Sequence, residues 1–245
     1  MLSFFKKKYE PRPIFAPLGT DMHCHLVPKV DDGSKCVEES IECLQTLKAV
    51  GYNKVIITPH FQHPRFPNDE EDIKRRYEEL KKQAADEGVE IELAGIGGEY
   101  RIDSGFAKRL ESPKFLKVGG KYVLVEFSLH QQMMGSDELI FDLQMKGYEV
   151  ILAHPERYPY LNVNGMRMEQ LKNQGVYFQI NSLSLGGFYG EEAKQRAFEM
   201  LERGWVEFMG TDTHNTMYAQ ALRDLTHNRK VQKVMEKYQF LNNTL

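Results

Sequence analysis

The sequence is poor in cysteine, has no surplus of positive charge and lacks any long hydrophobic run. Its only three cysteines, Cys24, Cys36 and Cys43, suit reduced thiols in the cytoplasm better than a disulfide framework. The formal net charge of −3 argues against nucleic-acid binding. No apolar run approaches the roughly 18 residues of a membrane span. The lysines at 6–8 follow a short apolar block instead of preceding it, so we expect no signal peptide.

Two kinds of motif are also missing: the loop that activates a cysteine nucleophile and the glycine-rich loops that bind nucleotides. No arginine occurs in the eight residues after any cysteine, which excludes the Cys-x5-Arg loop of phosphatases that use a thiolate nucleophile. Gly95, Gly97 and Gly98 do not extend into Gly-x-Gly-x-x-Gly, and no P-loop follows an apolar run. The sequence therefore does not indicate a nucleotide-binding fold.

What the sequence does contain, from residue 20 onward, is an alternation of short apolar runs and helical segments. We expect seven strands, ending near residues 25, 58, 96, 125, 153, 180 and 209, each followed by a helix. Ser34 is the expected N-cap of the first helix, and a single helix is expected after the last strand, up to Gln239. This order predicts an α/β fold with a TIM-like (β/α)7 barrel, one unit short of the usual eight. An open doubly wound sheet is the alternative.

The amino-terminal segment differs in composition from the rest. Residues 1–19 are basic, aromatic and interrupted by prolines, so we predict an irregular arm there, either a flexible tail or a strap packed on the domain. A single folded domain is expected to span residues 20–245.

Metal-competent side chains follow six of the seven expected strands. They are His23, His25, His60, Glu99, Glu126, His154, Asp212 and His214, with Asp32 in the loop after the first strand. In parallel βα folds the carboxyl ends of the strands converge on one face, so these nine residues are expected to meet there. His23 and His25 are one residue apart on an extended segment, so their side chains point the same way.

Each of these residues has a structural alternative when it is taken alone. His60 fits a turn, Glu126 fits an ion pair with a lysine, and His154 fits a core histidine. Together, so many acids and imidazoles without matching lysines are costly to bury unless cations are present. Nine candidates exceed the three or four protein ligands of one zinc ion, so we predict two or three divalent ions, an arrangement typical of phosphate-ester hydrolysis. Arg157 offers a planar fork to phosphate oxygens, with a surface ion pair as the alternative.

Read in order, these motifs resemble the PHP (polymerase and histidinol phosphatase) superfamily of metal-dependent phosphoesterases, and within it the CpsB/YwqE branch. The matching segments are Asp21-Met22-His23-Cys24-His25, Val30-Asp31-Asp32-Gly33, Thr58-Pro59-His60, Gly98-Glu99-Tyr100-Arg101-Ile102, Val125-Glu126-Phe127, His154-Pro155-Glu156-Arg157-Tyr158 and Thr211-Asp212-Thr213-His214-Asn215. The resemblance covers residues 20 to about 235. It implies the PHP fold, a distorted seven-unit barrel.

The resemblance also implies a trinuclear site, with manganese as the expected metal and iron or zinc as alternatives. One ion would be held by His23, His25, Glu99 and Asp212, a second by Glu99, Glu126 and His154, and a third by Asp32, His60 and His214. Arg157 would bind the phosphoryl group, and Asp32 and His214 are candidates for proton transfer to the leaving group.

The function that the resemblance implies is protein-tyrosine phosphatase activity linked to capsular or exopolysaccharide biosynthesis. The expected partner is the phosphotyrosine tail of a membrane-associated bacterial tyrosine kinase. Two alternatives fit the same motifs: a PHP phosphatase for a small ester such as histidinol phosphate, and a non-catalytic metal-bound scaffold. The chain departs from the family in its first 19 residues and in lacking the glutamine often found before the Glu99 equivalent. No feature of the sequence indicates the oligomeric state.

Overall fold

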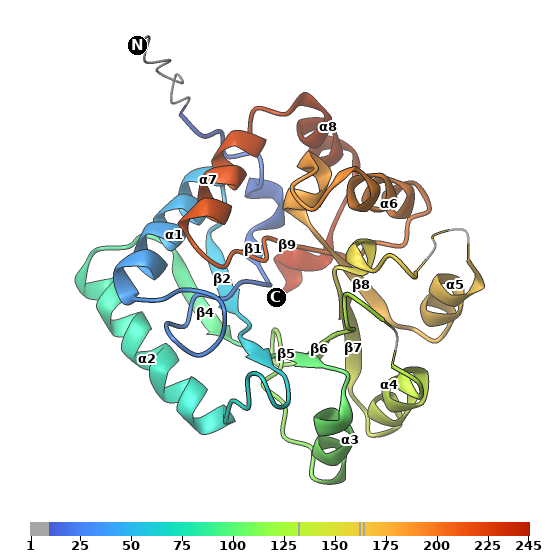
Figure 1. Cartoon of the computed structure of the whole chain (residues 1–245). Helices are drawn as coiled ribbons and strands as arrows, with labels where there is room; N and C mark the ends of the chain where they lie inside the picture. The colour runs from blue at the N-terminus through green and yellow to red at the C-terminus, as the bar shows by residue number, and fades with distance from the viewer. Residues whose placement is uncertain (1–9, 132, 162, 164) are drawn as a thin grey trace, which may run out of the picture.

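The computed structural model describes residues 10–245 except 132, 162 and 164. The strands gather around one axis and the helices cover their outer side (Figure 1). The strands are β1 (Thr20–Asp21), β2 (Lys54–Ile57), β3 (His60–Phe61), β4 (Glu92–Ile96), β5 (Glu99–Arg101), β6 (Tyr122–Glu126), β7 (Glu149–Ala153), β8 (Tyr177–Asn181) and β9 (Phe208–Gly210). The α-helices are α1 (Val37–Val50), α2 (Glu70–Asp86), α3 (Ser104–Glu111), α4 (Ser136–Met145), α5 (Met166–Asn173), α6 (Glu191–Glu202), α7 (Thr216–Leu225) and α8 (Arg229–Lys237). None of the helices in the described ranges is long and apolar enough to cross a membrane.

The strands form a distorted seven-stranded ring. They belong to two parallel sheets, ordered β1-β2-β4 and β3-β5-β6-β7-β8-β9. After breaks of two residues, β3 continues the line of β2 and β5 continues the line of β4, and across these breaks the Gly97 amide donates to the Ile57 carbonyl. A parallel bridge between Cys24 and Thr213 joins the first strand line to the last. The predicted barrel is therefore confirmed, and the open sheet is excluded.

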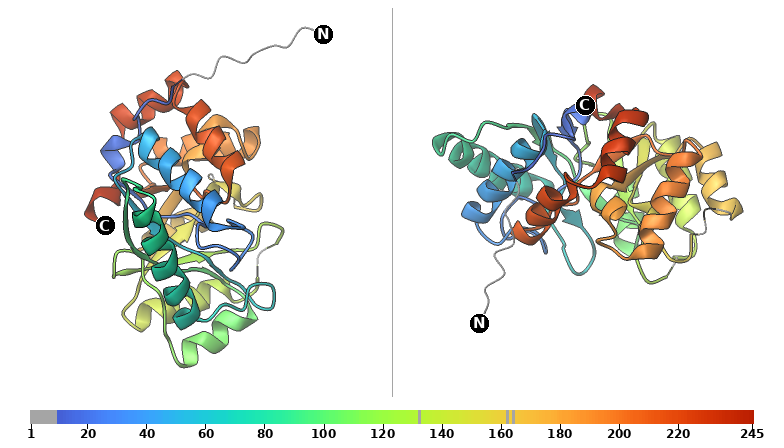
Figure 2. Two further views of the ribbon diagram at one scale, coloured as in Figure 1. Left: turned by 90° about the vertical axis from the view of Figure 1, so that its left-hand side faces the viewer. Right: turned by 90° about the horizontal axis from the view of Figure 1, so that it is seen from above.

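The end of the chain packs against β1 and β9, on the side of the barrel away from the loops that follow β1 and β3. In the short 3-10 helix Leu241–Thr244, Asn242 is fully buried. Its amide nitrogen donates to the carbonyls of Thr20 (2.9 Å) and Met209 (2.6 Å), and its oxygen accepts from the Met209 amide (3.0 Å). The C-terminus lies opposite the loops that follow β1 and β3 (Figure 2). One asparagine thus links two strands that form no ladder with each other in the described part of the chain.

Strand periodicity explains how polar side chains reach the interior. An inner apolar cluster fills the barrel, and a larger one packs between strands and helices. In β6, Tyr122 and Leu124 belong to the inner cluster while Val123 and Val125 face the helices. Successive side chains of a strand point to opposite faces. The side chain of Glu126, two residues after Leu124, therefore points into the barrel at the end of β6. We call this end of the barrel, where the strands finish, the mouth.

Two expected elements differ in the structure. Helix α1 begins after Cys36 instead of Ser34, because the Ser34 amide donates to the His25 carbonyl and holds that residue in the preceding loop. The single helix expected after the last strand is divided into α7 and α8. The Thr226 hydroxyl donates back to the Arg223 carbonyl, and the Asn228 side chain caps the start of α8, so local side-chain hydrogen bonds replace the continuous helix.

The described part of the amino-terminal arm packs on the domain. Phe15 is fully buried and stacks on Tyr52 with ring centroids 5.5 Å apart. The Phe15 amide donates to the carbonyl of Val50, and the Arg12 amide donates to the hydroxyl of Thr226. Residues 10–19 therefore connect the end of α1 to the turn between α7 and α8, and residues 1–9 lie outside the described residues.

Candidate metal centre

The first group of donor atoms in the mouth comes from the two ends of the barrel sequence. The Nε2 atoms of His23 and His25 lie 3.2 Å apart. Asp212 Oδ1 is 3.5 and 3.3 Å from them, and Glu99 Oε2 is 3.4 Å from each. Donors bonded to one ion at ~2.1 Å lie ~3.4 Å apart at the tetrahedral angle. The four side chains therefore have the spacing that a single divalent cation requires.

Glu99 connects this group to further donors. Its other oxygen, Oε1, lies 3.0 Å from His154 Nε2. Glu99 Oε2 also lies 2.9 Å from His60 Nδ1, and that nitrogen is 3.3 Å from Glu126 Oε1. The structure thus brings Glu99 together with His154 on one side and with His60 and Glu126 on the other. One carboxylate with donors around both oxygens is suited to bridging two cations.

The third group lies at the exposed edge of the mouth. Asp32 Oδ1 is 3.5 Å from His60 Nε2 and 3.6 Å from His214 Nε2. The side chain of Asp32 is 40% exposed and those of His60 and His214 are 13% exposed, whereas His23, His25 and Glu99 are fully buried. These three residues therefore form the most exposed part of the donor set.

Hydrogen bonds behind the imidazoles set which nitrogen faces the centre. The acceptors are Asp31 Oδ2 for His25 Nδ1 (2.9 Å) and the Asp212 carbonyl for His214 Nδ1 (2.8 Å). With Nδ1 protonated and donating, each Nε2 is left with a free lone pair, which is the arrangement of metal-binding histidines. Asp31 stands in a motif that the sequence identified, but no role had been predicted for it.

The charges of the mouth also call for cations. Burial opposes ionisation of Glu99, but positive His23 and His60 outweigh it and hold the pKa of Glu99 well below its usual value. Burial likewise opposes a charged His60, yet Glu99 and then Glu126 raise the pKa of His60 to about 10. Glu99 Oε2 and His60 Nδ1 are buried and, although they lie 2.9 Å apart, neither makes a hydrogen bond within the described residues. Such atoms are costly to bury unless a ligand satisfies them, so the donor set fits divalent cations.

The backbone is strained at two of these residues. His154 and Asp212 have φ of 36° and 54°, in the left-handed region, which costs about 1–3 kcal/mol for a residue other than glycine. His154 directly follows β7 and Asp212 lies two residues after β9, so the strain falls where these strands end at the mouth. Gly33 allows the loop after β1 to close on the site, since a Cβ there would lie 2.1 Å from the His25 carbonyl oxygen.

Three arginines surround the carboxylates of the mouth. Arg157 Nη1 lies 2.8 Å from Asp212 Oδ2, and its guanidinium lies 4.2 Å above the Tyr189 ring. Arg101 donates to Glu126 Oε1 and Arg65 to Asp32 Oδ2, both at 3.1 Å. Sequence reasoning identified only Arg157. The alternation of β5 could have indicated Arg101, which lies two residues after Glu99 and so on the same side of the strand.

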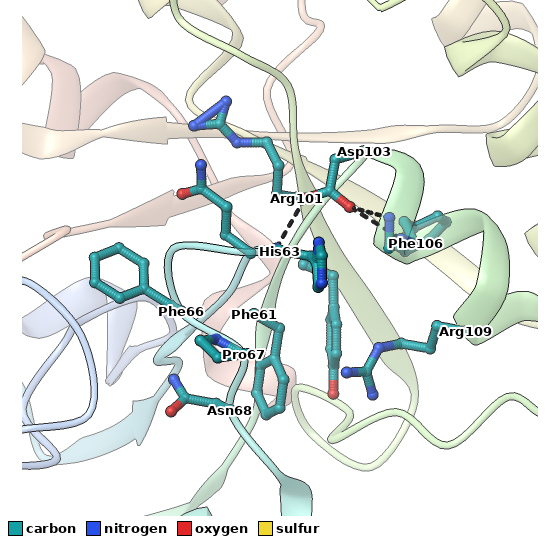
Figure 3. A pocket seen from close by; sticks show the side chains of 12 residues that line it. Phe61, His63, Phe66, Pro67, Asn68, Arg101, Asp103, Phe106 and Arg109 are labelled. Carbon is teal, nitrogen blue, oxygen red and sulfur yellow. Dashed lines mark hydrogen bonds between the residues drawn. The ribbon is translucent and has the colours of Figure 1, made fainter.

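Open cavities lie on both flanks of the mouth. On the Arg157 flank, Tyr189 and Leu129 help to line a cavity of about 350 Å³. On the other flank, a cavity of about 180 Å³ lies beside Phe66, whose ring is parallel to that of His60 at 5.5 Å. In Figure 3 the Phe66 ring and the Arg101 guanidinium lie on one side of this cavity, and Arg109 lies on the other. Each cavity is therefore lined by a residue that contacts a donor of the mouth, Arg157 beside Asp212 and Phe66 beside His60.

Fold and site together define the class: an α/β barrel whose mouth gathers several groups of metal-competent side chains flanked by arginines. A family model described as capsular polysaccharide synthesis, CpsB/CapC, matches residues 19–240. The chain therefore belongs to the CpsB/CapC family, as its motifs predicted.

Similar proteins agree with this assignment. The chain is 30% identical over 196 residues to tyrosine-protein phosphatase YwqE of Bacillus subtilis, covering 80% of this chain and 77% of that relative. It is 31% identical over 201 residues to tyrosine-protein phosphatase CpsB of Streptococcus pneumoniae, covering 80% and 82%. A crystal structure from work on YwqE and CpsB as unique metal-dependent tyrosine phosphatases superposes with a TM-score of 0.76 at 26% identity, covering 89% of this chain and 90% of that one. This structural likeness supports the barrel fold independently of the motifs.

Proposed function

We propose that this chain is a metal-dependent protein-tyrosine phosphatase. The observation that carries the proposal is the joint presence of cation-spaced donors around His23, His25, Glu99 and Asp212 and of Arg157 on the outer oxygen of Asp212. Membership of the CpsB/CapC family and similarity to relatives named tyrosine-protein phosphatases support it.

The nine residues of the mouth would hold two or three divalent ions. We propose manganese, with iron and zinc as alternatives, because the donors are imidazoles and carboxylates without a thiolate. Cys24 does not take part, since burial raises the pKa of its thiol well above its usual value. When bound, such ions polarise a phosphoryl oxygen and lower the pKa of bound water to near 7.

The remaining chemistry falls to side chains of the chain itself. Arg157 is 19% exposed and borders the larger cavity, so its guanidinium can bind equatorial oxygens of the phosphoryl group. The leaving phenolate of tyrosine has a pKa of ~10, so it needs less proton assistance than an alkoxide. His214 and Asp32, at the exposed edge, are the groups that we propose for proton transfer.

Access to the centre favours a phosphotyrosine on a protein segment. The exposed edge at Asp32 and the cavities on both flanks leave room for residues on either side of the phosphorylated one. We propose as substrate the phosphotyrosine tail of a membrane-associated tyrosine kinase of capsular or exopolysaccharide synthesis, dephosphorylated in the cytoplasm. Family membership and three free cysteines support this assignment.

The test is hydrolysis by metal-stripped protein refilled with manganese. Phosphotyrosine peptide, phosphoserine peptide and histidinol phosphate would be compared, with His154→Ala as the inactive variant and His130→Ala, at an exposed loop position, as its control. We expect manganese-dependent release from the phosphotyrosine peptide alone. Release only from histidinol phosphate would make the chain a small-ester phosphatase, and retained metal without any turnover would make it a scaffold.

A further inference from the structure

Two buried amide side chains connect residues of the first donor group behind the mouth. Asn181 Nδ2 lies 2.7 Å from Asp212 Oδ2, and Gln179 Nε2 lies 2.9 Å from Asn181 Oδ1. Gln179 Oε1 in turn lies 2.8 Å from His23 Nδ1. Gln179 and Asn181 are fully buried. A continuous path of hydrogen bonds therefore runs from Asp212 to His23, the two residues whose other atoms face the same cation position.

The direction of every hydrogen bond along this path follows from its first member. An ionised carboxylate only accepts, so Asn181 must turn its NH2 group toward Asp212. Its oxygen then faces Gln179 and accepts from the Gln179 NH2 group. The Gln179 oxygen is left facing His23, so His23 must donate from Nδ1. The proton of neutral His23 is thereby fixed on Nδ1, and its Nε2 lone pair faces the cation position.

The fold holds this path in place from three sides. Gln179 and Asn181 are two residues apart in β8, so their side chains project on the same side of the strand. The backbone N–H of Asn181 donates to the buried carboxylate of Glu156 at 2.8 Å. Gly210 leaves the space in which His23 and Gln179 meet, since a Cβ there would lie 2.6 Å from His23 Cβ and 2.9 Å from Gln179 Nε2.

We propose that Gln179 and Asn181 are positioning residues that select the His23 tautomer and orient Asp212 for one shared cation. The inference rests on the proposed function only in that this cation is the one used in hydrolysis. The competing explanation is that the two amides simply satisfy each other in the interior. The explanations differ because only the positioning role requires that loss of either amide side chain change the His23 tautomer and weaken metal binding.

The first measurement is the tautomer of His23 in metal-free protein. The ring nitrogens of 15N-labelled protein are observed by NMR at alkaline pH, where the imidazole is neutral. We expect wild type to carry the proton on Nδ1. Gln179→Met removes the acceptor and is expected to give a mixture of tautomers, whereas Gln179→Glu keeps an acceptor and is expected to retain the Nδ1 proton. Gln144→Met is the control, because Gln144 also donates from Nε2 to an oxygen but lies outside the mouth.

The second measurement is the affinity of the tightest manganese site, from the electron paramagnetic resonance signal of free manganese. Loss of a residue that orients a metal ligand typically weakens metal binding about 10–100-fold, and we expect a loss of that size in Gln179→Met and none in Gln144→Met. Affinity within twofold of wild type, or an unchanged tautomer, would overturn the proposal.

Asn181→Ala provides an independent test if Gln179→Met does not fold. Without Asn181 the Gln179 amide is free to rotate by half a turn, so His23 should populate both tautomers and bind manganese more weakly. A pure Nδ1–H tautomer in this variant would also overturn the proposal. Neither measurement uses a phosphate ester, so a failure of the phosphatase assignment would leave both expected results unchanged.

Discussion

Removal of Arg157 separates binding of the phosphoryl group from binding of metal. Arg157 donates to Asp212 Oδ2 at 2.8 Å, but that oxygen also accepts from Asn181 at 2.7 Å and from Tyr189 at 3.2 Å. In Arg157→Ala two of these three donors remain, so Asp212 should keep its orientation and the protein should keep its metal. The variant therefore loses a group that contacts the reacting phosphate while its metal centre persists.

The size of the effect follows from the position of the guanidinium. A preorganised donor to charge that develops in the transition state contributes about 10²–10³-fold in rate, so we expect kcat/KM of Arg157→Ala to fall by that factor. Arg157→Lys should recover only part of the loss, because lysine offers a point charge without a planar fork for bidentate contact or stacking on Tyr189.

The assay combines manganese content by mass spectrometry with initial rates on a phosphotyrosine peptide at saturating manganese. Arg75→Ala, on the exposed side of α2, is the control for removal of one positive charge. A rate for Arg157→Ala within twofold of wild type would refute the role of Arg157. A loss of rate accompanied by an equal loss of manganese would show instead that Arg157 acts by holding Asp212.

Three further predictions concern metal retention, barrel closure and pH. His154→Ala removes the nitrogen 3.0 Å from Glu99 Oε1, and we expect loss of bound manganese together with a fall in rate of more than about 10²-fold; unchanged metal content and rate would contradict this role. Asn242→Ala leaves three hydrogen bonds to buried backbone groups unmade, so at about 1 kcal/mol each we expect the unfolding free energy of metal-free protein to fall by about 3 kcal/mol in urea denaturation. Asn243→Ala, at an exposed position, should change it little, and a fall below about 1 kcal/mol in Asn242→Ala would contradict the closing role. Finally, the pKa of His60 rises from 6.5 to about 10 on folding. Protonated His60 therefore stabilises the folded state fully below pH 6.5, and this contribution is lost as the pH rises toward 10. The unfolding free energy of metal-free protein, measured by urea denaturation, should fall over that range. Manganese competes with the same proton, so its affinity should increase over that range. A manganese affinity independent of pH would contradict this competition.

Much of the fold and of the site follows from short stretches of sequence. Apolar runs of strand length between amphipathic segments indicated the barrel, because both periodicities are local properties of the backbone. The same reasoning placed polar residues at the ends of the strands, and the alternation of β6 carries Glu126 to the mouth next to the inner residue Leu124. The spacing of His23 and His25 likewise required no knowledge of the rest of the chain.

Tertiary structure decided which residues from distant parts of the chain meet. The pairing of Glu126 with His60, the path through Gln179 and Asn181, and the contact of Asn242 with β1 and β9 depend on how the ring of strands closes. No periodicity indicates these pairings, since each residue is an ordinary polar side chain until the fold brings a partner within about 3 Å. The sequence by itself determined that metal-competent side chains stand at one end of a barrel. Only barrel closure determined which of them lie at the spacing of a shared cation and which buried amides contact them, because those relations are distances between strands far apart in the chain.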